Sequence, residues 1–169
     1  RVDRTVEEVH VFGVSGGRLR LGQVIPRAIK VKAPQSVVID YGSNDLANGE
    51  QPLVLASLMV DHARRLVDEY KVEKVMICAI LRRERGSSLP ISQLNQNIVL
   101  YNQIMKDYCE VEPGLEFHQH LGFWSNDISD WSSDRIHPNT VTGFDRYVSS
   151  IRRAIIKASR NVCKYSKYV

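Results

Sequence analysis

Short runs of apolar, β-branched residues alternate with longer amphipathic stretches along the chain, and this alternation limits the fold more than any other feature of the sequence. The β-branched runs predict strands, whereas apolar residues that recur every three or four positions predict helices. Strands and helices in alternation are typical of an α/β fold with a mainly parallel sheet. The predicted strands are residues 9–14, 36–41, 74–80 and 115–121.

Three helices are expected between and after these strands. Apolar residues recur at helical spacing over residues 55–70, 94–108 and 144–158. Each predicted helix should cover a face of the sheet. A chain of 169 residues is long enough for one ordinary domain, so residues 1–169 are assigned to a single domain.

Composition excludes disordered and fibrous proteins, because 43% of the residues are hydrophobic and 25% are charged. The formal net charge of +4 reflects basic residues that gather after Phe144. They would attract nucleic acid weakly. Basic residues on the outer face and last turns of a closing helix are the favoured explanation, with nucleic-acid binding as the alternative.

The three cysteines, Cys78, Cys109 and Cys163, are scattered and form no C-x-x-C pair. They predict neither a disulfide framework nor a zinc site. The sequence also contains no apolar run of membrane-spanning length and no signal peptide at its start, which favours a soluble protein of the cytoplasm.

Two polar clusters flank predicted elements at positions where a parallel sheet gathers functional groups. GSND at residues 42–45 follows the second strand, and DRIH at residues 134–137 precedes the last helix. The spacing allows the Asp134 carboxylate to accept a hydrogen bond from Nδ1 of His137. Nε2 would then be free to take a proton from a nucleophile, so this pair is a candidate acid–base unit.

Asn44 and Gly16 are candidate donors to a developing oxyanion. Asn44 offers a side-chain amide at a strand end, and Gly16 offers a backbone N–H that a missing side chain leaves approachable. Taken singly, such residues more often serve in turns and helix caps. Two further histidines, His118 and His120, alternate along a predicted strand, so we expect them on opposite faces and not as joint metal ligands.

Taken together, these clusters resemble characteristic blocks of the SGNH hydrolases, also called GDSL-type esterases and lipases. GSND is similar to the G-x-N-D block, DRIH to the D-x-x-H block, and Ser15-Gly16 after an apolar run to a third block. The residues around them also resemble, more loosely, those of GDSL-like domains in invertebrate and retroelement-associated proteins. The resemblance covers nearly the whole chain. It implies a flavodoxin-like, three-layer α/β/α sandwich.

Carried over position by position, the resemblance implies that Gly16 and Asn44 bind the oxyanion. It makes His137 the general base and Asp134 its orienting partner. The implied activity is hydrolysis of acyl esters or acetylated substrates through an acyl-enzyme, without a metal or cofactor.

The catalytic serine of this family has no counterpart here. The family places it in a G-D-S-type motif after a first strand that lies a few tens of residues before the Gly16 block. Only fifteen residues precede Gly16, and they hold no such motif. We therefore expect the chain to lack the first strand, to be truncated at its start and to be inactive alone. The lost strand would expose the edges of its two neighbours.

Two alternatives stay open. Residues 13–17 read G-x-S-x-G, and the order Ser15, Asp134, His137 is that of an α/β-hydrolase triad. This hypothesis is less favoured, because Gly22 and Pro26 interrupt the helix that must follow a nucleophile elbow. The second alternative is a degenerate hydrolase domain that binds a ligand or a protein without catalysis.

Overall fold

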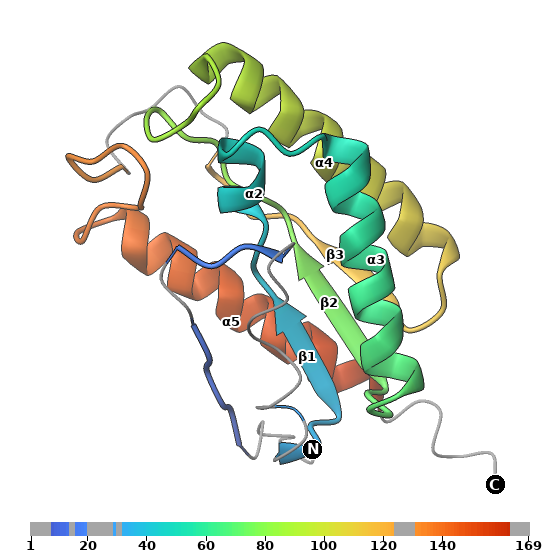
Figure 1. The fold of residues 1–169 in the computed structure, drawn as a ribbon. Helices are drawn as coiled ribbons and strands as arrows, with labels where there is room; N and C mark the ends of the chain where they lie inside the picture. The colour runs from blue at the N-terminus through green and yellow to red at the C-terminus, as the bar shows by residue number, and fades with distance from the viewer. Residues whose placement is uncertain (1–7, 14–15, 20–28, 30–31, 124–130, 163–169) are drawn as a thin grey trace, which may run out of the picture.

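A parallel sheet of three strands lies at the centre of the protein (Figure 1). The computed structural model describes residues 8–13, 16–19, 29, 32–123 and 131–162. The strands are β1 (Ser36–Ile39), β2 (Lys74–Cys78) and β3 (Leu115–His118), and they lie side by side in this order. All three run in the same direction, so their carboxyl ends meet at one edge of the sheet.

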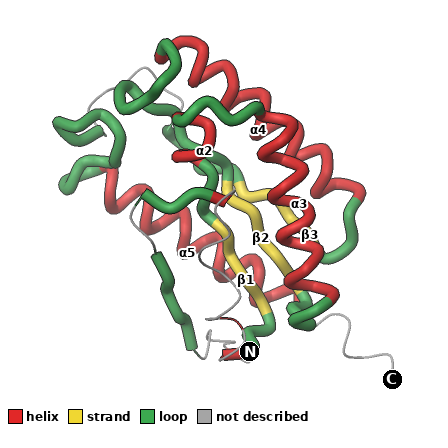
Figure 2. The backbone as a smooth tube through the Cα atoms, viewed as in Figure 1, coloured by secondary structure: helices red, strands yellow, loops and turns green. Residues whose placement is uncertain are grey.

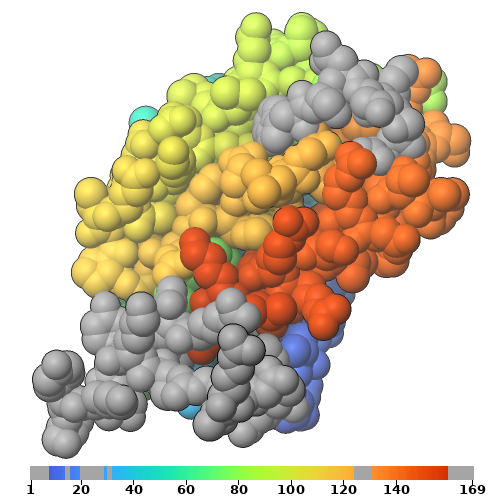
Figure 3. Space-filling view, turned by 180° about the vertical axis from the view of Figure 1, so that it is seen from behind, coloured from blue at the N-terminus to red at the C-terminus, as the bar shows by residue number. Residues whose placement is uncertain are grey.

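Helices cover both faces of the sheet (Figure 2). α3 (Pro52–Asp68) and α4 (Ile91–Val111) lie on one face, and α5 (Gly143–Val162) lies on the other. Figure 3, drawn from behind, shows the residues of α5 at the surface on this side of the molecule. The short helix α2 (Ser43–Ala47) stands just beyond the end of β1. This arrangement confirms the predicted three-layer α/β/α architecture.

The alternation of side chains along β2 explains the two layers of core. Val75 and Ile77 point to one face and pack with the apolar residues of α3 and α4. Met76 and Cys78 point to the other face and pack with Ala154 and other small apolar residues of α5. Every residue of β2 is buried, because the strand lies between two neighbours and two helical layers.

Three of the four predicted strands are confirmed, and each ends slightly earlier than predicted. All three predicted helices are also confirmed. The strand predicted over residues 9–14 is wrong. Residues 9–13 form no strand, and Val11 is 88% exposed; Val14 lies outside the described residues. A β-branched run forms a strand only where a neighbouring strand pairs with it and its side chains pack against a buried face. No described strand pairs with this segment.

Truncation of a buried side chain on α3 should show how much this core layer stabilises the fold. Leu55 is 0% exposed and Leu53, two residues earlier on the same helix, is 60% exposed. We expect Leu55→Ala to lower the free energy of unfolding by about 2–5 kcal/mol, because it removes buried methyl groups and leaves a cavity. Leu53→Ala should change it by less than about 0.5 kcal/mol. Urea unfolding measures both, and equal losses would contradict this packing.

Candidate active site

The turn between β1 and α2 brings the GSND segment to the carboxyl edge of the sheet. Gly42 has a φ of +105°, a left-handed conformation that lets the chain leave β1 and enter the helix at once. A Cβ atom at this position would lie 3.2 Å from Cδ1 of Ile80 and 3.3 Å from Cδ2 of Leu55. Glycine is therefore required here by backbone geometry and by close packing, and it sets the position of Asn44.

The segment around Gly16 is tied to α2 by two hydrogen bonds. Nδ2 of Asn44 donates to the carbonyl oxygen of Gly17 over 3.2 Å, and the backbone N–H of Leu19 donates to Oδ2 of Asp45 over 3.0 Å. Gly16, with a φ of +66°, stands next to this contact, and among the described residues no atom lies within 4 Å of the position that a Cβ would take. The structure thus brings Gly16 and Asn44, 28 positions apart in the sequence, to neighbouring places.

The DRIH segment forms a tight loop just before α5. Nδ1 of His137 lies 2.7 Å from Oδ2 of Asp134. The other carboxylate oxygen of Asp134 accepts hydrogen bonds from the backbone N–H groups of Ile136 and His137, at 2.9 and 3.0 Å, and from the hydroxyl of Ser132. The predicted Asp134–His137 pair is therefore present, and its carboxylate is held in one orientation.

The loop's hydrogen bonds determine the charge state of its carboxylate. The hydrogen bond with His137, then those with the Ser132 hydroxyl and the backbone, hold the pKa of Asp134 well below its usual range. The carboxylate is thus ionised and can stabilise a protonated imidazole. The His137 side chain is 74% exposed, and its Nε2 has no hydrogen-bond partner among the described residues. This nitrogen is accessible to an incoming group.

The loop that follows β2 joins the GSND and DRIH segments. The backbone N–H of Glu84 donates to the carbonyl oxygen of Arg135 over 2.9 Å, which fastens this loop to the DRIH segment. On the other side, Nη2 of Arg83 donates to Oδ1 of Asn44 over 2.6 Å, and Nε donates to the Ser43 hydroxyl over 2.8 Å. Arg83 was missed by the sequence analysis, although its place just after a buried strand was a usable signal.

The expectation that His118 and His120 lie on opposite faces is wrong. Nε2 of His118 and Nδ1 of His120 lie 2.9 and 3.0 Å from the same Ser150 hydroxyl on α5. Residues two positions apart in a strand share a face, as Val75 and Ile77 do, so the spacing of these histidines was misread and favoured one face rather than two. Burial lowers the pKa of His120 to about 4, which keeps its ring neutral in the core. These histidines fasten α5 to the sheet.

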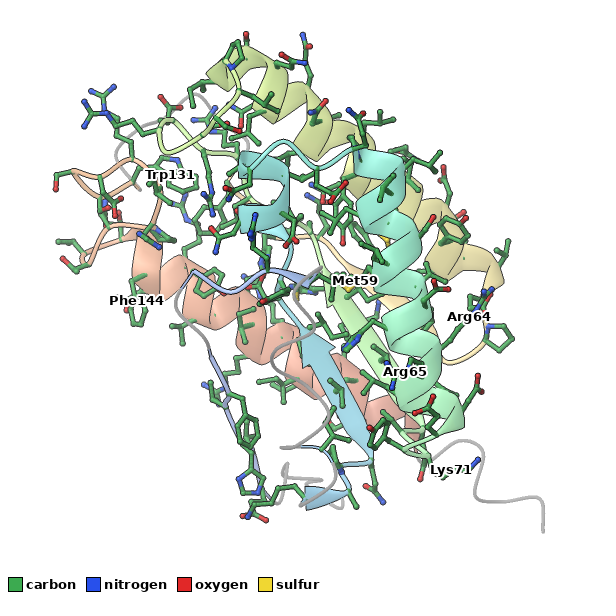
Figure 4. All side chains as sticks on the ribbon, in the orientation of Figure 1. Met59, Arg64, Arg65, Lys71, Trp131 and Phe144 are labelled. Atoms are coloured by element: carbon green, nitrogen blue, oxygen red, sulfur yellow. The ribbon has the colours of Figure 1, made fainter. Side chains whose placement is uncertain are left out.

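The remaining candidates from the sequence are a serine, a tryptophan, a metal site and a membrane-spanning helix. Ser15 lies outside the described residues. Trp131 is buried and packs edge-on against Phe123, with ring centroids 6.2 Å apart, near the start of α5 (Figure 4). In the part of the chain that the structure describes, no three His, Cys, Asp or Glu side chains are grouped to hold a metal ion. None of the helices in that part is long and apolar enough to cross a membrane.

Comparison with known families identifies this arrangement. The model of the GDSL-like Lipase/Acylhydrolase family matches residues 1–141, which include both polar segments. The chain belongs to this family. No curated protein matches the chain in sequence.

Solved structures support the fold of this GDSL-like domain. A candidate acylhydrolase from Bacteroides fragilis matches with a TM-score of 0.61 and 21% identity, over 74% of this chain and 62% of that one. A candidate platelet activating factor from Streptococcus pneumonia matches with a TM-score of 0.57 and 14% identity, over 70% and 58%. A GDSL-like lipase from Bacteroides thetaiotaomicron matches with a TM-score of 0.50 and 23% identity, over 75% and 64%. The matches thus span less than two thirds of each of these proteins.

The charge state of Asp134 in the GDSL-like domain yields a pH prediction. Its pKa is lower in the folded protein than in the unfolded chain, so its stabilising effect on the loop is present above the ordinary carboxyl pKa. The effect is lost as the pH falls through the lowered value. Ser132→Ala and His137→Ala should each move the pKa of Asp134 back toward its ordinary value. Carboxyl ¹³C titration by NMR measures this.

Ser133→Ala is the matched control for Ser132→Ala, because Ser133 neighbours Ser132 and its hydroxyl makes no hydrogen bond to Asp134. The titration of Asp134 should be the same in this variant as in the unmodified protein. An Asp134 titration that stays unchanged in both the Ser132→Ala and His137→Ala variants would disprove the assigned hydrogen bonds.

Proposed function

We propose that this chain supplies the general base and the oxyanion-binding groups of a serine esterase that acts through an acyl-enzyme. The observation that carries this proposal is the 2.7 Å contact between Nδ1 of His137 and the ionised carboxylate of Asp134, with Nε2 accessible. Membership of the GDSL-like lipase/acylhydrolase family supports the same reaction class. The proposed substrate is a small acyl ester or an acetylated molecule.

The proposed reaction has two halves. Nε2 of His137 takes the proton of a serine hydroxyl while the serine oxygen attacks the acyl carbon. The tetrahedral oxyanion accepts hydrogen bonds from the Gly16 N–H and from Nδ2 of Asn44. The imidazolium, stabilised by Asp134, then gives its proton to the leaving alcohol, which leaves an acyl-serine. Water activated by His137 attacks this acyl group, releases the acid and regenerates the serine hydroxyl.

The nucleophile is proposed to lie in a segment that precedes residue 1 in the intact protein. Among the described residues, no serine, threonine or cysteine side chain forms a hydrogen bond to Nε2 of His137. A serine on an additional strand beside β1 would reach the carboxyl edge of the sheet, where Asn44 and His137 lie, because parallel strands end at one edge. On this proposal the chain alone is inactive, and Ser15 is a neighbour of the oxyanion donor.

Hydrolysis of p-nitrophenyl acetate by the protein with its preceding segment tests this proposal. We expect His137→Ala and Asp134→Asn each to lower kcat by about 10⁴-fold, since the base or its orientation is lost. Asn44→Ala should lower kcat by about 10²–10³-fold, because one oxyanion donor is removed.

A serine variant and a histidine control distinguish the esterase proposal from the hypothesis that Ser15 is the nucleophile. Ser15→Ala should retain activity, and its inactivity would instead favour Ser15 as nucleophile. His62→Ala is the control for a histidine on α3, away from the proposed chemistry, and it should retain kcat. Activity that survives His137→Ala would refute the esterase proposal. A protein with no activity on any ester would favour a binding domain.

A further inference from the structure

A buried arginine faces the oxygen of the proposed oxyanion-binding amide. Arg83 is 8% exposed, and its guanidinium group donates to Oδ1 of Asn44 over 2.6 Å. The oxygen and nitrogen ends of an asparagine amide have nearly the same shape, so hydrogen-bond partners decide which end points where. Asn44 binds the oxyanion only if its N–H end faces the Gly16 segment. Something in the structure must therefore hold the amide in that orientation.

We infer that Arg83 is a positioning residue that holds the Asn44 amide with Nδ2 toward the oxyanion. Arginine has only donors, so the rotated amide would place N–H groups of Asn44 against N–H groups of Arg83. In the observed orientation, Nδ2 instead donates one hydrogen to the Gly17 carbonyl and keeps its second hydrogen for a substrate. This inference rests on the proposed function, because it gives the Asn44 amide a catalytic purpose.

Arg83 is itself held by the polar side chain of a helix residue. The backbone N–H of Arg83 donates to Oδ1 of Asn95 over 3.0 Å, and Nδ2 of Asn95 donates to the Arg83 carbonyl over 2.9 Å. Asn102 makes the same pair of bonds to Ile80, at 2.8 and 2.9 Å. The two asparagines are seven residues apart on α4, which is two helical turns, so they lie on one face. Their side-chain amides thus bond the backbone N–H and C=O groups beyond β2, as the backbone of a neighbouring strand would.

The charge of Arg83 adds to its effect on orientation. Burial lowers the pKa of the guanidinium group, while the nearby Asp134 carboxylate raises it. Arginine stays protonated at neutral pH, so the amide oxygen of Asn44 accepts from a positive charge. Such a hydrogen bond is stronger than a neutral one, and it polarises the amide so that its N–H becomes a better donor. The gain is largest when negative charge develops on the substrate, so it raises kcat more than it lowers KM.

NMR of the ¹⁵N-labelled protein tests the contact without reference to catalysis. In Arg83→Met, we expect the Asn44 amide to lose its fixed orientation, so that the hydrogen bond from Nδ2 to the Gly17 carbonyl opens more often and the Nδ2 hydrogens exchange with solvent about tenfold faster. Arg83→Lys, which keeps the charge but presents its donors on one nitrogen instead of a planar fork, should give an intermediate rate. Arg82→Met is the matched control, because the Arg82 guanidinium lies 3.7 Å from Glu84 instead.

The NMR outcomes decide between positioning and incidental contact. If the Arg83→Met variant does not fold, the exchange rate of the Asn44 side-chain amide in the Arg83→Lys variant decides by itself. Exchange and chemical shift of the Asn44 amide that match the unmodified protein in every folded Arg83 variant would overturn the inference.

A double-mutant cycle on ester hydrolysis tests the catalytic consequence. Arg83→Met should lower kcat by about tenfold with KM within about twofold, since it weakens an interaction made in the transition state. In an Asn44→Ala background the same substitution should have no further effect, because Arg83 acts through Asn44. A tenfold loss that persists in that background would overturn the inference. If Asn44→Ala leaves kcat intact, the proposed function fails, whereas the NMR result still decides on the contact.

Discussion

The parallel pairing of β2 with both neighbouring strands is the constraint on which the rest of the structure depends. β2 is buried on both faces and along both edges, so its backbone hydrogen bonds can be satisfied only by β1 and β3. Parallel pairing then places three strand ends at one edge. The polar segments that follow these strands meet there, although they are separated by up to about a hundred positions in the sequence.

The candidate site at this edge is a series of hydrogen bonds in which each donor has an acceptor. The Asp134 carboxylate accepts from His137, the loop after β2 donates to the DRIH segment, and Arg83 donates to Asn44. The first contact lies within the DRIH loop and the other two join one loop to the next, so the orientation of each polar group depends on its neighbour. The fold thus assembles this network without a bound ligand, as the proposed electrostatic catalysis requires.

The two errors of sequence analysis have different causes. The run at residues 9–14 has strand composition, yet residues 9–13 form no strand, because pairing depends on a partner that local composition does not report. His118 and His120 are two positions apart, a spacing that puts strand side chains on the same face, so the prediction of opposite faces misapplied strand periodicity; both rings lie against Ser150. The first error needed knowledge of tertiary pairing, whereas the second could have been avoided from the sequence.

The sequence by itself determined the layers, the order of the three strands and three long helices, and the Asp134–His137 pair, but not the short helix α2. These features follow from hydrophobic periodicity and from a three-residue spacing, both of which are local. Only the tertiary structure decided that Asn44 contacts the Gly16 segment, and that Arg83 donates to the oxygen of the Asn44 amide. Arg83 and Asn44 are 39 positions apart and meet because β1 and β2 end side by side. No local pattern encodes such a contact.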